Sequence, residues 1–236
     1  MISLHQLVQI QKRFELKVNM SRERDLATEH ENFPQSHEGW QNRFFHCRKT
    51  KRDVSLIFPE RCERKMKHRI VEEFETLSPL RFLNRSTVWT GSGVQGYPWI
   101  QAWSEGEPLV NARVHGPAYW DGKNRGYHID LGEFLDQGVR FTLYTEAMFI
   151  DESGTFEPRN IVRTPETLEE LKITVAFKNP PNSATYKYSR SLERAAPHCT
   201  EEVLNLEERF GMPAFNVAIF NCPMGQHGVY WKSLPC

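Results

Sequence analysis

Histidines, cysteines and one glycine-rich run are the residues of this 236-residue sequence whose types could do chemistry. His128-Ile-Asp130 places an imidazole and a carboxylate on the same side of an expected strand, which is a pair that a general base or a metal site uses. No third ligand or nucleophile follows from the spacing. If the protein is a small enzyme, we expect its polar pocket to use His115, His128, Asp130 and His227.

Two thiol and imidazole pairs, His198-Cys199 and Cys222 with His227, suggest nucleophilic chemistry as a further option. The competing interpretation, which we favour, is a buried thiol beside a hydrogen-bonded histidine. Five cysteines without a CxxC pair do not fit a zinc ribbon, and their odd number favours buried thiols over a disulfide framework.

The glycine-rich run Gly91-Ser-Gly93-Val-Gln-Gly96 matches the GxGxxG pattern of dinucleotide-binding loops. Such a loop needs a helix directly after it, because the N–H groups of the helix bind the phosphates. Tyr97-Pro98-Trp99 instead continues as a strand or a turn. We therefore predict no nucleotide site there, no metal and no cofactor.

Charge and composition limit the classes of partner. Thirty basic and thirty acidic residues give a formal net charge of zero, which argues against nonspecific nucleic-acid binding and permits close association of copies. A hydrophobic fraction of 39% and 12% aromatic residues are typical of a folded globular protein. The sequence shows no membrane-length apolar run and no signal-peptide pattern, so we expect synthesis in the cytosol and no membrane attachment.

The stretch 173–188 combines a strand, a double-proline turn and a returning strand. Residues 173–177 alternate with the period of a strand that buries one face, and Pro180 with Pro181 must end it. Tyr186 and Tyr188 then share one face. We expect the prolines to hold a rigid surface corner and the two rings to anchor packing, within the chain or between subunits.

Helices are predicted in five segments, of which residues 22–30, with Ser21 as the cap, form a short second piece. Residues 1–16 place Leu4, Leu7 and Phe14 at helical spacing and could form an arm that docks on a neighbouring subunit or on its own domain. Residues 60–77 carry an apolar stripe at spacings of four, four, four and three: Cys62, Met66, Ile70, Phe74 and Leu77. Residues 164–172 and 200–211 each show a threonine cap and acidic residues in the first turn, and the second ends at Gly211.

Strands are expected elsewhere. A hairpin is predicted from residues 40–47 and 54–58 with 48–53 as its loop. Further strands follow at 87–90, 97–103, 109–115, 127–131, 139–150, 217–221 and 229–232. The sequence thus predicts an α+β fold: a β-sandwich-like body over residues 37–236 with flanking helices, and an N-terminal helical arm with its linker over 1–36.

Parts of the chain resemble cypovirus polyhedrins, the insect-virus proteins that crystallise around virions. The likeness lies in Phe177-Lys-Asn-Pro-Pro-Asn-Ser-Ala-Thr-Tyr186, in His198-Cys199 leading into the helix expected up to Phe210, in Pro213-Ala-Phe-Asn-Val-Ala-Ile-Phe-Asn221 and in His227-Gly-Val-Tyr230. Chain length and the order of a first helix, a hairpin, a long helix, many strands and a late helix agree with it. Residues 80–170 show no match.

The resemblance implies a structural protein that is not an enzyme, a homotrimer packed into intracellular crystals. Such crystals, or occlusion bodies, lie in the cytoplasm of infected cells, embed and protect virus particles, and dissolve at alkaline pH. Ionisation of tyrosines and loss of lysine charge above about pH 10 would explain the dissolution. Two alternatives remain: a viral matrix-type protein, and a β-barrel ligand-binding protein or small enzyme with the histidine-lined pocket.

Overall fold

The described part of the chain is built from strands. The structure is a computed structural model that describes residues 46–60, 64–88, 90–93, 96, 98–121, 124–192 and 197–232. Within these residues there are strands and no helix, and hence no helix that could cross a membrane. The strands are β1 (Cys47–Phe58), β2 (Lys65–Thr76), β3 (Leu80–Val88), β4 (Trp99–Ser104), β5 (Glu107–Pro108), β6 (Arg113–Asp121), β7 (Asn124–Leu135), β8 (Arg140–Ile150), β9 (Arg159–Thr164), β10 (Leu168–Phe177), β11 (Ala184–Ser189), β12 (Thr200–Leu204), β13 (Leu206–Arg209), β14 (Met212–Cys222) and β15 (Gly225–Trp231).

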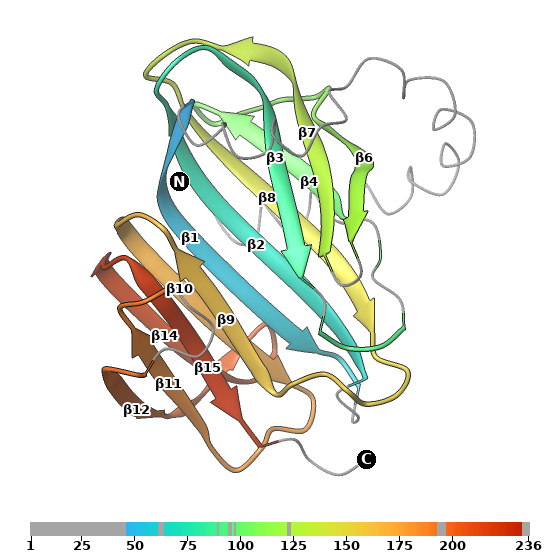
Figure 1. The fold of residues 1–236 in the computed structure, drawn as a ribbon, viewed down its shortest axis with the longest axis vertical. Helices are drawn as coiled ribbons and strands as arrows, with labels where there is room; N and C mark the ends of the chain where they lie inside the picture. The colour runs from blue at the N-terminus through green and yellow to red at the C-terminus, as the bar shows by residue number, and fades with distance from the viewer. Residues whose placement is uncertain are drawn as a thin grey trace.

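Three sheets make up the described fold. The large sheet has eight strands in the order β13-β14-β10-β1-β2-β8-β4-β5, with β1 and β10 parallel. A four-stranded sheet, β12-β11-β15-β9, and a three-stranded sheet, β3-β7-β6, accompany it. In Figure 1 these two small sheets lie beside each other along the length of the large one.

Each small sheet buries its own hydrophobic core against the large sheet. The first core joins β1, β10 and β14 to the four-stranded sheet, with Phe58, Phe177 and Trp231 in ring contact at its centre. The second joins β2, β4 and β8 to the three-stranded sheet. Met66 and Phe74 of β2 belong to different cores but sit an even number of residues apart, so both point to the same face of the large sheet. Both small sheets therefore cover that one face.

The prediction of an α+β fold with flanking helices is wrong, and β2 shows why. A spacing of four residues is close to one turn of a helix, but it is also twice the repeat of a strand. Met66, Ile70 and Phe74 are every second member of the inward face of β2, and the positions between them, His68 and Glu72, carry polar side chains on the same face. Because these two inward positions are polar, the apolar residues alone repeat every four positions, and the two-residue repeat of a strand is not visible in the sequence.

The other predicted helices within the described residues are strands too. Residues 164–172 end β9 and begin β10, and residues 200–211 form β12 and β13. Gly211 does not stop a helix, because it forms the turn of a β13–β14 hairpin together with Phe210, and both have positive φ angles (69° and 57°). Two positive φ angles are the signature of a type I′ hairpin turn. The late helix and the long helix in the order shared with polyhedrins are therefore absent.

The predicted hairpin over residues 40–58 is also wrong in its second half. The supposed loop, 48–53, lies inside the continuous strand β1. Residues 40–45 and the expected helical arm with Leu4, Leu7 and Phe14 lie outside the described residues.

Most of the strand predictions are confirmed. Strands β4, β6, β7, β8, β14 and β15 overlap the segments expected from their patterns. The stretch 173–188 is a strand, a turn and a strand, and its prolines carry the chain from the large sheet to the four-stranded sheet, since β10 and β11 belong to different sheets. The corner at Pro180 and Pro181 is thus a passage between layers.

Gly225 of β15 lies close to Ser189 and Tyr188 of β11, and a substitution there tests this close approach. Its φ is +149°, and a Cβ there would lie against the Ser189 carbonyl oxygen and 2.8 Å from the Tyr188 ring. We expect Gly225→Ala to lower the free energy of unfolding by about 2 kcal/mol or more, from strain and overpacking together. Urea denaturation measures the change.

Gly106→Ala is the matched control, because Gly106 also has a positive φ (+91°) but its Cβ would meet no atom within 4 Å. It should lower stability by about 1 kcal/mol through backbone strain alone. Equal effects of the two substitutions would contradict the close approach at Gly225.

Candidate functional site

The residues of the predicted histidine pocket belong to two different sheets. His128 and Asp130 share one side of β7, as expected, and both are buried. His227 belongs to β15 in the other small sheet. His115 is paired with His128 between β6 and β7, and its side chain lies outside the described residues.

His128 and Asp130 each contact a neighbouring strand. The His128 Nδ1 lies 2.5 Å from the Asn84 side-chain oxygen, so Nδ1 carries the proton and donates. The Asp130 carboxylate accepts from Arg81 Nε at 2.9 Å and Nη2 at 3.2 Å, and from the Gly132 N–H. Burial alone would raise the pKa of Asp130, but these hydrogen bonds and the Arg81 charge hold it below its usual range. The carboxylate is thus committed to fixing β3 and the β7 backbone.

Cys222 and His227 do come together, and Tyr186 completes a chain of contacts. The Cys222 Sγ lies 3.4 Å from His227 Nε2, and the Tyr186 hydroxyl lies 2.9 Å from Nδ1. The Pro223 carbonyl oxygen lies 3.0 Å from Nε2. A carbonyl only accepts, so Nε2 carries the proton, and Nδ1 accepts from Tyr186. The nitrogen beside the thiol is therefore a donor and cannot act as its base.

The environment of this cluster also keeps the thiol neutral. Cys222 and His227 are both completely buried. Burial raises the pKa of Cys222 to about 11 and lowers that of His227. A reactive cysteine needs the opposite, a lowered pKa and an accessible thiolate. The favoured interpretation, a buried thiol beside a hydrogen-bonded histidine, is confirmed for this pair.

The two tyrosines of the 173–188 stretch pack within the chain. Tyr188 stacks on the His227 ring with centroids 4.8 Å apart, and its hydroxyl donates to the Met224 carbonyl. Tyr186 is only 7% exposed. Their role as packing anchors is confirmed inside one chain, and a role between subunits stays a prediction.

Thiol labelling of the native protein tests this assignment. Cys199 is exposed and Cys222 is buried with a raised pKa, so a maleimide should modify Cys199 first and Cys222 only as fast as the protein unfolds. Peptide mass spectrometry reads each site separately, and labelling in denaturant gives the reference rate. Native labelling of Cys222 at a rate equal to that of Cys199 would show an activated thiol and sink the structural assignment.

The glycine-rich run is fixed to the end of β8. The Ser92 N–H and hydroxyl both donate to Asp151 at 2.8 Å, and the Gly96 N–H donates to the Met148 carbonyl. Asp151 is buried and also accepts the Phe156 N–H at 2.6 Å. The Ser92 and Gly96 N–H groups are thus used inside the protein.

A buried group of charges lies between the two cores, and sequence reasoning missed it. We call it the Glu72 cluster: Glu72, Lys49, Arg52 and Arg85. The Glu72 carboxylate is 2% exposed and contacts Lys49 Nζ at 2.6 Å, Arg52 Nε at 3.2 Å and the Arg85 guanidinium. Along β2, Glu72 sits between Ile70, which packs on the first core, and Phe74, which is in the second.

A β-bulge brings the two basic residues of β1 to the same face. Lys49 is opposite Phe74 and Arg52 is opposite Glu72, with the register shifting between Lys49 and Lys51. Residues three apart in a regular strand point to opposite faces, but the extra residue of a bulge restores them to one side. The bulge is thus what allows both side chains to contact Glu72.

Electrostatics keep the Glu72 cluster charged. Burial alone would raise the pKa of Glu72, but the charges of Arg85, Lys49 and Arg52 outweigh it and hold that pKa far below its usual range. Burial lowers the pKa of Lys49 to about 8. The Phe74 ring also stabilises the two positive charges of Lys49 and Arg85, which lie over it at 5.7 and 5.1 Å from its centroid.

A small cavity of about 10 Å³ adjoins this cluster. Its polar lining comes from His68, Tyr127 and Thr145, and its volume suits about one water molecule. Burial and the Arg52 charge lower the pKa of His68 to about 4, and burial raises that of Tyr127 to about 12. Both groups are therefore neutral near pH 7. Among the described residues, no three histidine, cysteine or acidic side chains are grouped as a metal site.

Removing the Glu72 charge should be far more damaging than removing a surface one. Glu72→Gln leaves three largely buried cations without their carboxylate, so we expect a loss of about 3–5 kcal/mol in the free energy of unfolding. Glu75→Gln is the matched control on the same strand, because Glu75 pairs with the half-exposed Arg48. It should change stability by less than about 1 kcal/mol.

The pH dependence gives a second readout of Glu72→Gln. A carboxylate with a lowered native pKa stabilises the fold above its unfolded value, 4.5, and that contribution is lost as the pH falls below it. The free energy of unfolding of Glu72→Gln should therefore fall less than that of the wild type as the pH is lowered below 4.5. Equal stability losses in the two variants would contradict the account of the cluster.

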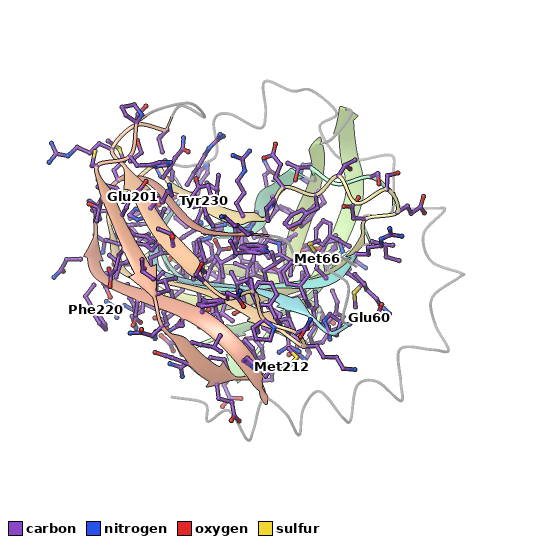
Figure 2. The ribbon with its side chains drawn as sticks, turned by 90° about the horizontal axis from the view of Figure 1, so that it is seen from below. Glu60, Met66, Glu201, Met212, Phe220 and Tyr230 are labelled. Carbon is purple, nitrogen blue, oxygen red and sulfur yellow. The ribbon has the colours of Figure 1, made fainter. Side chains whose placement is uncertain are left out.

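A second feature is the exposed edge that residues 200–209 form, which we call the 200–209 edge. β12 ends the four-stranded sheet and β13 ends the large sheet, so one short segment closes the same side of both. Four glutamates and exposed apolar residues lie on it, among them Val203 (70% exposed) and Leu206 (52%). Phe220 of the neighbouring β14 is 69% exposed. Figure 2 shows Glu201 and Phe220 on the same side of the molecule.

Comparison with known proteins adds little. No family model matches the chain, and no curated protein matches it. An M1 zinc metallopeptidase from Deinococcus radiodurans matches at 14% identity over 78% of this chain and 42% of that chain, with a TM-score of 0.43. A structure described as a putative protease from Parabacteroides distasonis matches at 9% identity over 79% and 41%, with a TM-score of 0.47. The chain spans about two fifths of these proteins, and likeness at this level carries no argument about function.

Proposed function

We propose that this protein is a structural, self-associating protein that works through contacts between copies of the chain and not by catalysis. The observation that carries the proposal is the 200–209 edge, where two sheets end side by side and apolar side chains are exposed. Edge strands offer unpaired N–H and C=O groups to another chain, and most proteins shield them.

The apolar residues beside this edge supply the driving force. Val203 points to the outer face of the four-stranded sheet, opposite Thr185, while Phe220 is paired with Glu170 of the large sheet. Leu206 lies on the edge strand between them. Burying exposed apolar area contributes about 25 cal/mol per Å². Leu204 and Ile219 pack into the first core, so Val203 and Phe220 point to opposite outer faces, and a partner must extend around Leu206 to bury both.

The charge of the edge decides how two copies meet. Glu201, Glu202, Glu207 and Glu208 outnumber the one basic residue there, Arg209. Two identical edges would repel each other, so the partner surface must be a different, basic part of the next copy. The net charge of zero means that the rest of the chain carries the compensating positive charge. A contact between unlike surfaces continues into rings, fibres or lattices.

The occlusion-body form of this proposal, a trimer that packs into virus-embedding crystals as in cypoviruses, rests on the sequence resemblance alone. Its support is the strand, double-proline turn and strand at 173–188 and the closing strands β14 and β15. The long helix and the late helix that formed part of the resemblance are strands, and the first helix lies outside the described residues. Self-association is therefore the broader proposal, and crystal formation is its specific version.

Alkaline dissolution would need a different trigger from tyrosine ionisation in the core. Burial raises the pKa of Tyr127 to about 12 and also raises those of Tyr144 and Tyr186. These three phenols stay neutral at pH 10, so alkali would act through other groups, exposed lysines among them. The enzyme alternative has no geometric support, since His227 and the His128–Asp130 pair belong to different sheets.

Substituting the edge tests the proposal. The double variant Val203→Lys, Leu206→Lys places two charges on the 200–209 edge, and we expect its weight-average mass in sedimentation equilibrium to stay that of a monomer while the wild type rises with concentration. Salt should weaken wild-type association, because the edge is acidic and its partner surface basic.

Val110→Lys is the matched control, because Val110 is 84% exposed and lies far from the edge in sequence, between β5 and β6. It should associate like the wild type. A wild type that stays monomeric at all concentrations, or a double variant that associates as well as Val110→Lys, would refute the proposal.

A further inference from the structure

The Glu72 cluster holds more positive than negative charge. Lys49, Arg52 and Arg85 all contact the one carboxylate of Glu72. Glu166 stands at its rim, where the carboxylate accepts the Lys49 backbone N–H at 3.3 Å. Even with Glu166 counted, three cations face two carboxylates. Excess charge in a buried site is unfavourable unless a counter-charge is bound.

The basic side chains of the cluster reach solvent. The side chains of Lys49, Arg52 and Arg85 are 16%, 20% and 19% exposed, whereas Glu72 below them is 2% exposed. The carboxylate therefore occupies the inner side of the cluster. The outer side presents the donors of two guanidinium groups and an ammonium group from two elements, β1 and β3.

The three basic residues also come from positions that hold them still. The bulge in β1 fixes Lys49 and Arg52 on one face, and Arg52 Nη1 donates to the Arg163 carbonyl of β9 at 3.4 Å. Arg85 extends from β3, the edge strand of the other small sheet, and lies over Phe74. The cluster thus stands where both small sheets meet the large one, and its donors are preorganised.

We propose that the solvent side of the Glu72 cluster binds a small tetrahedral oxyanion, phosphate or sulfate, through Lys49, Arg52 and Arg85. Guanidinium groups match the oxygens of such an anion in planar, paired hydrogen bonds, and a lysine adds a point charge. The same chemistry would hold free phosphate or a phosphate monoester. This site is independent of self-association through the 200–209 edge.

Burial is the main cause of the pKa shifts of the neighbouring groups, and the charges of the basic side chains add to it. Burial lowers the pKa of Lys49 to about 8 even though Glu72 opposes the shift. Burial and the Arg52 charge lower the pKa of His68 to about 4. A bound anion would oppose the effect of the basic side chains and raise the pKa of Lys49.

The first test is the melting temperature of the full chain with inorganic phosphate, sulfate or glycerol phosphate, each against sodium chloride of equal ionic strength at pH 7. We expect a saturable rise of roughly 3 °C or more at about 10 mM phosphate. A response to inorganic phosphate and not to glycerol phosphate assigns free anion, and equal responses assign the phosphate group of a monoester. No rise with any of the three would overturn the proposal.

Two variants of the same strand locate the site. Lys49→Met should weaken the phosphate effect at least tenfold in concentration, while Lys51→Met should leave it unchanged, because Lys51 is paired with Glu73 on the opposite face of β1. A phosphate effect of equal size in both variants would place the anion elsewhere and overturn the assignment.

A measurement on the wild type covers the case in which Lys49→Met does not fold. Acylation of lysines at pH 8, followed by peptide mass spectrometry, should be slowed several-fold at Lys49 by phosphate and not at Lys51. Equal rates at Lys49 with and without phosphate would contradict the proposal regardless of how the variants behave.

Discussion

The buried carboxylate of Glu72 and the three basic side chains around it are the interaction on which the rest of the structure depends. It lies where the large sheet meets both small ones, between the two hydrophobic cores. Arg85 ties β3 to the large sheet, and Arg52 ties β1 to β9 through the Arg163 carbonyl. Burying such a group gains less than apolar packing would, but breaking it is severe, so the site fixes how the layers meet.

The same interaction explains the main failure of sequence reasoning. His68 and Glu72 occupy inward positions of β2, so its buried face reads as an apolar stripe with a spacing of four. Residues 200–211 failed differently: threonine, glutamates and glycine suit a helix, yet the same residues make a charged edge and a type I′ turn. Tertiary context overrode local preference in both segments.

Where the inward positions of a strand carry no charged side chain, its pattern was sufficient. The alternation in β8 and in residues 173–177 predicted strands, and Pro180 with Pro181 predicted the corner. Of the candidate site, only the pairing of Cys222 with His227 could be read from the sequence. Arg85 could not be joined to Glu72 in advance, because their contact needs the three-stranded sheet to cover β2, which no local pattern encodes.

Among the described residues, the candidate reactive side chains of Cys222, His227 and Asp130 are buried and hydrogen-bonded to protein groups. Exposed apolar side chains lie at the 200–209 edge. The tautomer of His227 makes its nitrogen beside Cys222 a donor, and the Asp130 carboxylate is occupied by Arg81 and the Gly132 N–H. The 200–209 edge, in contrast, exposes both backbone and apolar side chains. This distribution is the basis of the proposal that copies of the chain bind one another, and a neutral net charge is compatible with it.

Amide hydrogen exchange of the wild type at low and high concentration tests the central claim most directly. Self-association through the edge predicts that amides of residues 200–209 exchange more slowly as concentration rises, while those in the interior of β2 and β10 do not change. Exchange at residues 200–209 that is independent of concentration, in samples that sedimentation shows to be associated, would contradict the claim.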